Sequence, residues 1–167
     1  MVSSSSKLRI KICCISNVGE AAVAINAGTD AIGLVGKMPS GPGPIADELI
    51  FSIARTVPPP VATFLLTSEQ TAQGIIEHHH RTKPNTIQIV DELHDRDYAT
   101  IREALPHVKL VQVVHVTGEK SVDEAAELAE FVDAILLDSG NPTLAVKELG
   151  GTGRRHDWSL SRRIVET

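Results

Sequence analysis

Two short stretches far apart in the chain decide the expected fold: Lys11-Ile12-Cys13-Cys14-Ile15-Ser16-Asn17 near the start and Leu136-Leu137-Asp138-Ser139 near the end. Each contains an apolar run that stops at an ionisable side chain. The first predicts a buried strand over residues 8–13 that ends in the Cys13 thiol, and the second a buried strand over residues 134–137 that Asp138 follows. Chemistry in parallel α/β proteins is concentrated at the carboxyl ends of strands, so Cys13 and Asp138 are the first candidate functional residues.

Apolar runs alternate with helical patterns between these two stretches. Further strands are expected over residues 31–35, 61–66, 86–90 and 109–116, and helices over residues 18–27, 45–56, 68–82, 98–105, 121–130 and 157–164. Such alternation predicts an α/β fold with a parallel sheet and right-handed crossovers. The pattern alone leaves an open doubly wound sheet and a barrel as alternatives. The first strand is not followed by Gly-x-Gly-x-x-Gly, which disfavours a dinucleotide-binding sheet.

Composition and charge restrict the classes of function. The 167 residues, 42% of them hydrophobic, fit one domain over residues 8–167, preceded by a serine-rich segment, residues 1–7, that is expected to be disordered. A net charge of -5 argues against a nucleic-acid partner. Two adjacent cysteines make no disulfide framework, and neither a secretory signal nor an apolar run of membrane-spanning length is found. We therefore expect a cytoplasmic protein with no membrane partner.

Four blocks of residues carry a family resemblance: Lys11-Ile12-Cys13 with Ile15-Ser16-Asn17, Ala27-Gly28-Thr29-Asp30-Ala31-Ile32-Gly33, Leu136-Leu137-Asp138-Ser139, and Gly150-Gly151-Thr152-Gly153 with Asp157-Trp158-Ser159-Leu160. In this order and spacing they resemble phosphoribosylanthranilate isomerase, an enzyme of tryptophan biosynthesis. The resemblance implies a (β/α)8 TIM barrel. Because 167 residues are short for that fold, we expect a barrel truncated to about six βα units, without the seventh and eighth.

The resemblance also implies a reaction, the Amadori rearrangement of N-(5-phosphoribosyl)anthranilate to 1-(2-carboxyphenylamino)-1-deoxyribulose 5-phosphate, without cofactor or metal. A general acid protonates the ribose ring oxygen, and a general base takes the proton from C2. Cys13 matches the family's base and Asp138 its acid. A free carboxyl group has a pKa near 3.9, so burial and nearby negative charge are expected to raise the pKa of Asp138. The alternative roles are a small buried apolar group for Cys13 and a loop cap for Asp138.

Several further residues are expected to bind the small phosphosugar substrate: Lys11, Lys37, Gln88, Gly150, Gly151, Thr152 and Gly153. Lys11 shares a strand face with Cys13 and is expected below it in the barrel interior. Lys37 is the only charge in the Gly- and Pro-rich loop over residues 36–44. The glycine-rich run offers backbone amides or a lid, and the alternative is a flexible turn.

The chain departs from the family pattern at several positions. Cys14 replaces a glycine and is interpreted as packing outward. The loop over residues 36–44 lacks the arginine of a Ser-Pro-Arg sequence, and Val90 stands where the fourth strand has histidine. Asp91 is interpreted as a solvated loop carboxylate. His115 is expected near the mouth of the barrel. Consecutive helical residues point about 100° apart, so residues 78–80, three histidines, predict no metal site.

These departures leave three hypotheses. In the first hypothesis, the chain is an isomerase of this family. In the second, it is a non-catalytic barrel fragment that associates with another copy or a partner chain to cover its open edges. The third hypothesis is a different barrel enzyme acting on a phosphosugar, motivated by the missing arginine and histidine. The family's phosphate site follows strands seven and eight, beyond the six expected units.

Overall fold

The computed structural model describes residues 8–151 and 153–167. The prediction of disorder for residues 1–7 lies outside this range. Six strands alternate with six helices in the described chain, in the order β1 (Lys11–Ile12), α1 (Val18–Asn26), β2 (Ala31–Val35), α2 (Asp47–Ala54), β3 (Ala62–Thr67), α3 (Ala72–Thr82), β4 (Thr86–Ile89), α4 (Tyr98–Ala104), β5 (Lys109–His115), α5 (Lys120–Ala129), β6 (Ala134–Asp138) and α6 (Trp158–Glu166). The predicted alternation is confirmed, with small differences at the element ends.

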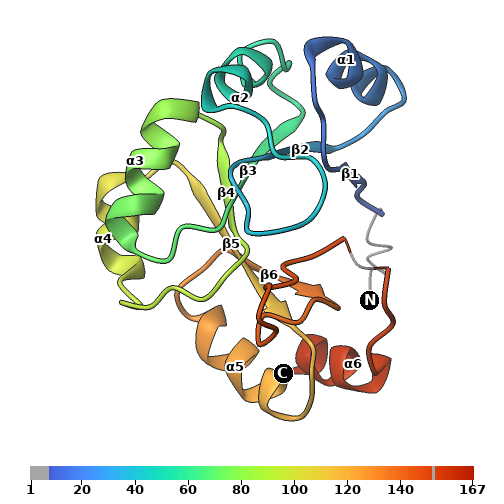
Figure 1. Cartoon of the computed structure of the whole chain (residues 1–167), viewed down its shortest axis with the longest axis vertical. Coiled ribbons are helices and arrows are strands. Elements are labelled where there is room, and N and C mark those ends of the chain that lie inside the picture. The colour runs from blue at the N-terminus through green and yellow to red at the C-terminus, as the bar shows by residue number, and fades with distance from the viewer. Residues whose placement is uncertain (1–7, 152) are drawn as a thin grey trace, which may run out of the picture.

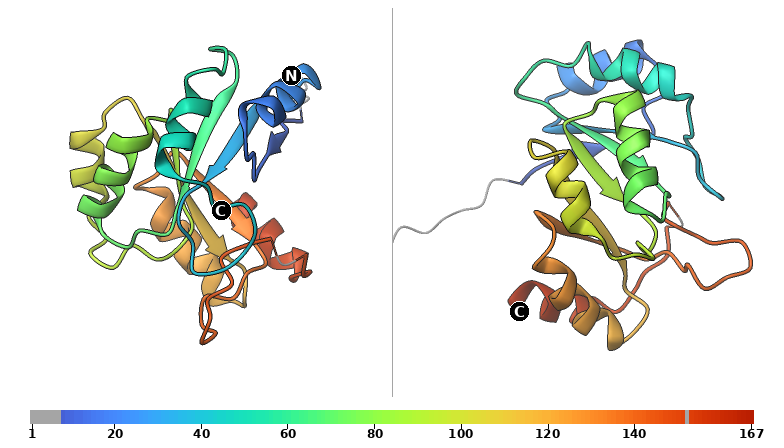
Figure 2. Two further views of the ribbon diagram at one scale, coloured as in Figure 1. Left: turned by 45° about the horizontal axis from the view of Figure 1, so that its top comes forward. Right: turned by 90° about the vertical axis from the view of Figure 1, so that its left-hand side faces the viewer.

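All six strands form one parallel sheet in sequential order from β1 to β6. Figure 1 shows the sheet curving, with the helices along its outer side. The same arrangement is visible in both rotated views of Figure 2. Sequential order and an outer layer of helices are the geometry of a βα barrel rather than of a doubly wound sheet, whose strand order reverses. The fold is therefore six units of a barrel, open between β1 and β6.

The two edge strands differ from their predicted burial. Ile12 of β1 is 38% exposed, Ile10 before it is 51% exposed, and all five residues of β6 are at least partly accessible. Each edge strand pairs with one neighbour among the described residues, so part of its apolar surface remains open. Both predicted strands are present, the first shortened to Lys11–Ile12, but the prediction that they are buried is wrong for this reason. Within residues 8–151 and 153–167, no helix is long and apolar enough to cross a membrane.

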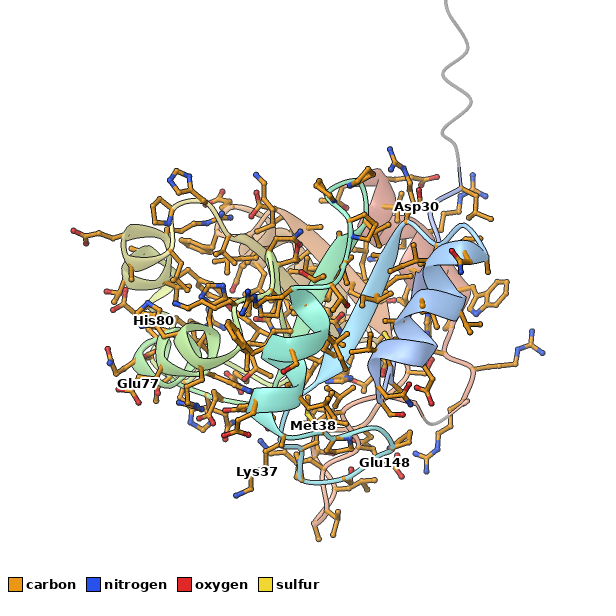
Figure 3. The ribbon with its side chains drawn as sticks, turned by 90° about the horizontal axis from the view of Figure 1, so that it is seen from above. Asp30, Lys37, Met38, Glu77, His80 and Glu148 are labelled. Carbon is orange, nitrogen blue, oxygen red and sulfur yellow. The ribbon has the colours of Figure 1, made fainter. Side chains whose placement is uncertain are left out.

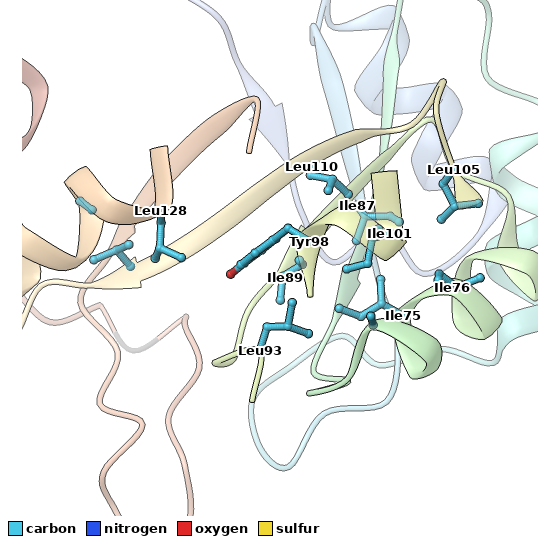
Figure 4. Packing of buried hydrophobic residues seen from close by; sticks show 13 residues of the cluster. Ile75, Ile76, Ile87, Ile89, Leu93, Tyr98, Ile101, Leu105, Leu110 and Leu128 are labelled. Carbon is cyan, nitrogen blue, oxygen red and sulfur yellow. The ribbon is translucent and has the colours of Figure 1, made fainter. Parts of the chain in front are cut away.

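The main core lies between the sheet and the helices α3, α4 and α5. Ile75, Ile87, Ile101 and Leu110 are buried there to 1% exposure or less, and Figure 4 shows them in one cluster with Tyr98. Truncating one of these isoleucines to alanine is expected to cost about 2–5 kcal/mol. A second core packs α1 and α2 against β2 and β3. These cores hold the carboxyl ends of the strands in position.

Loops that follow the strands gather at one end of the molecule. Figure 3 shows Lys37, Met38 and Glu148 at one end and Asp30, which precedes β2, at the other. The loop after β2 contacts the loop after β6, because Ser40 Oγ donates a hydrogen bond to the carbonyl of Lys147. The carboxyl ends of the strands are thus covered by two segments about a hundred residues apart in sequence.

Candidate active site

A cavity of about 230 Å³ opens at the carboxyl ends of the strands, beneath these two loops. Most of its lining is apolar. Cys13, which follows β1, and Asp138, which ends β6, both line it. The predicted acid and base therefore reach one cavity from the two edge strands of the sheet.

Cys13 lies over β2. A Cβ built on Gly33 would lie 2.7 Å from Cys13 Sγ, closer than real contacts allow. The absence of a side chain at Gly33 therefore leaves the space that the thiol occupies. Ser16 and Asn17 precede α1 just beyond the thiol, with Asn17 as its N-cap. The side chain of Asn17 accepts a hydrogen bond from the Glu20 amide, and the Glu20 side chain accepts one from the Ser16 amide. This reciprocal capping gives part of the motif a structural role.

Lys11 lies in the barrel interior on the same side as Cys13, where it was expected. Its ammonium group donates a hydrogen bond to Gln88 Oε1 on β4 and sits 4.5 Å from the centre of the Phe64 ring. Both Lys11 and Gln88 line the cavity. Lys11 is the only cationic side chain among the described lining residues, so it gives the cavity a positive site that a neutral side chain holds in place.

Cys14 has a left-handed backbone with φ of 61°. This conformation favours glycine, the residue that the family usually has here. The prediction that Cys14 packs outward is wrong. Its thiol donates to the carbonyl of Pro42 at 3.6 Å, and its side chain lines the cavity. The left-handed turn after β1 directs it toward the loop after β2, although the residue stays exposed. Burial raises the pKa of the Cys14 thiol, and Cys13 adds to the rise.

Asp138 is held by two contacts. Its Oδ2 lies 3.5 Å from His115 Nδ1 and accepts a hydrogen bond of 2.6 Å from the Gly140 amide. The contact with His115 lowers the pKa of Asp138, burial opposes this, and the Gly140 amide adds to the lowering. The expectation of a raised pKa is therefore wrong, because a histidine and a backbone donor face the carboxylate instead of a second negative charge. The hydrogen bond from the Gly140 amide also gives Asp138 the alternative role of capping the following loop.

Asp91 is a buried carboxylate, contrary to the interpretation as a solvated loop residue. It is 5% exposed, and its Oδ2 lies 2.6 Å from Lys147 Nζ in the loop after β6. The partner comes from 56 residues away, which no local pattern indicates. Sequence reasoning also missed His115 as the partner of Asp138, although it placed His115 near the mouth. Their register as neighbours on β5 and β6 is the signal that would have paired them.

The glycines of the run over residues 150–153 do not all lie at the cavity. Gly150 and Gly151 line the cavity, and a Cβ built on Gly150 would lie 3.8 Å from both carboxylate oxygens of Asp138. Gly153 has open space around its Cα and lies outside the lining. Thr152 lies outside the described residues. Gly150 thus lies close to the Asp138 carboxylate, whereas Gly151 faces Pro42 of the loop after β2.

Lys37 is not brought together with the other predicted residues. It lines a neighbouring surface hollow with Ser68, Asp91 and Lys147. Its carbonyl accepts a hydrogen bond from Ser68 Oγ, which fixes the start of the loop over β3. The arrangement therefore gives no support to the predicted contact between Lys37 and substrate.

The three consecutive histidines point to different partners. His78 Nδ1 contacts Thr67 Oγ1 at 2.8 Å, and His79 Nε2 donates to the carbonyl of Pro84 at 2.8 Å. His80 is exposed. Among residues 8–151 and 153–167, no group of three or more His, Cys, Asp or Glu side chains is arranged to hold a metal ion.

The sequential six-stranded fold and the acid and thiol in its cavity define a βα-barrel enzyme with its site at the carboxyl ends of the strands. The N-(5'-phosphoribosyl)anthranilate isomerase 2 of Methanosarcina mazei is 33% identical to this chain over 160 residues, which cover 95% of the chain and 70% of that protein. This chain belongs to the phosphoribosylanthranilate isomerase family. The predicted isomerase class, within tryptophan biosynthesis, is thereby confirmed.

Further comparisons agree. The isomerase of Methanosarcina acetivorans is 31% identical, with 96% of this chain and 71% of that protein covered. The crystal structure of the isomerase from Thermotoga maritima matches with a TM-score of 0.71 and 27% identity, over 92% of this chain and 69% of that one. Another solved isomerase, 26% identical with a TM-score of 0.64, is in complex with reduced 1-(o-carboxyphenylamino)-1-deoxyribulose 5-phosphate and is covered over 64% of its length, against 78% of this chain. No protein-family model matches the chain.

Proposed function

We propose that Cys13 and Asp138 carry out the isomerisation of N-(5'-phosphoribosyl)anthranilate in this chain, as base and acid respectively. One observation carries the proposal: the two groups enter the same cavity from opposite edges of the sheet. An acid and a base on different sides of a sugar are what the rearrangement needs. Family membership supplies the substrate, a small phosphosugar, and the complex of a related isomerase with a reduced phosphosugar supports this ligand class.

The proton transfers balance within the site. Asp138 donates a proton to the ring oxygen, and the ring opens to a protonated imine. Cys13, as thiolate, then takes the proton from C2 to give an enolamine. The enolamine becomes the ketone when C1 receives the proton held by Cys13 and the C2 hydroxyl returns a proton to Asp138. Both groups end in their starting states, so no external oxidant, reductant or cofactor enters the cycle.

Lys11 is the side chain that we assign to an anionic group of the substrate. It is the described cation in the cavity, and Gln88 together with the Phe64 ring holds its ammonium group. An ammonium group that is already positioned loses little freedom when it pairs with a carboxylate or phosphate. Gly150 and Gly151 cover the other side of the bound sugar in this proposal.

Loss of anthranilate fluorescence tests the assignment. The substrate is generated in situ from anthranilate and phosphoribosyl pyrophosphate, and the purified chain is added. We expect turnover that Cys13→Ser and Asp138→Asn each reduce by at least about a hundredfold, the usual range for a general acid or base. Gly118→Ala is the control, since a Cβ there meets nothing within 4 Å. Turnover that survives either active-site substitution would disprove the assigned role of that residue.

We also propose that the chain associates with a second copy of itself and that it resides in the cytoplasm. The exposed apolar residues beside β1, Leu8 and Ile10 among them, support a second copy of this chain covering the open edges. Sedimentation equilibrium is expected to show a mass above the 17.9 kDa of one chain. A single species with the mass of one chain would overturn the proposed association. Free thiols at Cys13 and Cys14 support the reducing cytoplasm as the compartment.

A further inference from the structure

His115 is a buried imidazole that none of the steps above uses. It ends β5, and the parallel register pairs it with Asp138, which ends β6. Its side chain is 8% exposed. Nε2 lies 3.1 Å from the carbonyl oxygen of Val90. A carbonyl oxygen only accepts hydrogen bonds, so Nε2 must carry a hydrogen.

The other ring nitrogen faces the general acid. Nδ1 lies 3.5 Å from Asp138 Oδ2, is buried, and has no hydrogen-bond partner among the described residues. A neutral ring with its hydrogen on Nε2 would point the Nδ1 lone pair at a carboxylate. Two acceptors that face each other repel, more so where one of them is buried as Nδ1 is, and a proton between them removes the repulsion. The geometry therefore calls for one proton shared by the ring and the carboxyl group.

The surroundings keep this pair together. A Cβ built on Gly140 would lie 2.7 Å from His115 Nδ1 and 2.9 Å from Asp138 Oδ2. Any other residue at 140 would therefore push the two groups apart. Ser121 Oγ also donates to the His115 carbonyl at 3.1 Å, which fixes the backbone from α5. The ring is thus held by the Val90 carbonyl after β4 and by Asp138 of β6, and α5 holds the backbone of His115.

We propose that His115 is a positioning residue that shares one proton with Asp138 and so keeps the general acid loaded. The inference rests on the proposed role of Asp138. When the carboxyl group protonates the ring oxygen, the shared proton leaves and His115 remains neutral with its hydrogen on Nε2. The proton that returns from the C2 hydroxyl of the enolamine restores the pair. Neither group needs a proton from solvent during the cycle.

The charges around the ring agree with this assignment. Three carboxylates face His115: Asp138 from β6, Asp91 from the end of β4, and Glu124 from α5. Lys147 faces the same region through its ion pair with Asp91. Burial lowers the pKa of His115, but the contact with Asp138, the Val90 carbonyl and the charge of Asp91 outweigh it, so the pKa is raised.

Two substitutions separate proton sharing from packing. His115→Gln can keep an amide near Val90 while it removes Nδ1, and His115→Asn can place a fixed N–H beside Asp138. Neither amide can give up its proton. We expect both variants to lower kcat about tenfold or more at pH 7 and to move the alkaline limb of the kcat profile to lower pH. The proposal is overturned if His115→Asn keeps the wild-type kcat. It is also overturned if both variants keep the alkaline limb of the wild-type kcat profile. His107→Gln, in an exposed turn, is the matched control.

A second measurement needs no turnover and so separates this inference from the proposed function. The ring nitrogens of His115 are titrated by nitrogen-15 NMR in the full chain and in Asp138→Asn. The midpoint is expected above the ordinary histidine value of about 6.5 in the chain, and clearly lower in Asp138→Asn. An unchanged midpoint in the folded variant would show that the two groups share no proton, whatever the chain's activity.

Discussion

Lys147 Nζ lies 2.6 Å from Asp91 Oδ2 and ties the loop after β6 to the end of β4. Asp91 is almost fully buried, whereas Lys147 keeps about a third of its side-chain surface in solvent. Leu149 and Gly150, which follow in the same loop, line the cavity. The ion pair therefore connects the loop after β6, which lines the candidate active-site cavity, to the segment after β4.

Removing Lys147 should loosen this cover. Lys147→Met leaves the Asp91 carboxylate buried without its partner, so we expect a loss of about 1–3 kcal/mol in the free energy of unfolding. The partial exposure of Lys147 limits the loss. We also expect a rise in KM of about threefold to tenfold, because the loop holds the lining residues Leu149 and Gly150. Urea unfolding and the fluorescence assay measure the two effects.

The matched variants are Lys147→Arg and the double variant Asp91→Asn with Lys147→Met. Arginine keeps the charge and should retain most of the stability. The double variant removes the buried charge as well, and it should be more stable than Lys147→Met alone, which a double-mutant cycle detects. Strict additivity of the two single substitutions would show that the ion pair does not couple the loop to β4.

Gly33 leaves the space that the Cys13 thiol occupies. Its missing side chain leaves room for Cys13 Sγ, and a Cβ would also lie 3.2 Å from Leu66 Cδ1. We expect Gly33→Ala to displace the thiol and reduce kcat at least tenfold, with a loss of about 1–3 kcal/mol from overpacking. Gly118→Ala is the control for the general effect of adding a methyl group. A Gly33→Ala variant with wild-type kcat would mean that the thiol does not need this position.

The sequence predicted the alternating elements well because most strands are apolar runs bounded by clear turn signals. β2 was predicted to the residue, at Ala31–Val35. The edge strands were predicted less well, because burial of an apolar run depends on neighbours that the run itself does not specify. Ile10 and Ile12 have the pattern of buried residues but lie at an open edge.

The sequence could predict those residues of the candidate site whose position depends only on the end of their own strand. Cys13 and Asp138 both reach the cavity, as their positions indicated. The pairs His115 with Asp138 and Asp91 with Lys147 depend on strand register and on the path of a long loop. The raised pKa expected for Asp138 was wrong chiefly because His115, its neighbour across the sheet, lowers the pKa, and the nearby Gly140 amide adds to the lowering. Local sequence carries no information on such partners.

Cys14 offers a test of backbone strain. Its φ of 61° costs a non-glycine residue about 1–2 kcal/mol, and the greater freedom of glycine in the unfolded chain offsets part of that cost. We therefore expect Cys14→Gly to raise the free energy of unfolding by up to about 1 kcal/mol. Cys14→Val, which is β-branched, should lower it by more than 1 kcal/mol. Denaturant unfolding of both variants checks this, and equal stability of the two would contradict the left-handed backbone.

His78 predicts how stability depends on pH. Burial lowers the pKa of His78, and the nearby Asp47 carboxylate only partly opposes this. A folded pKa below the unfolded value means that protonation favours the unfolded state. The stabilising contribution of the neutral ring is therefore fully present above about pH 6.5, the ordinary histidine value, and is lost as the pH falls toward the lowered folded value.

His78→Gln removes this titration together with the contact to Thr67 Oγ1. We expect it to lower the free energy of unfolding by about 1–3 kcal/mol at pH 7.5 through the lost buried hydrogen bond. The cost should be clearly smaller at pH 5, because protonation of His78 destabilises the wild-type chain there and cannot affect the variant. Urea unfolding at both pH values measures the difference. His80→Gln, at an exposed position on the same helix, should change neither value. A cost for His78→Gln that is the same at both pH values would show that His78 does not stay neutral in the folded protein.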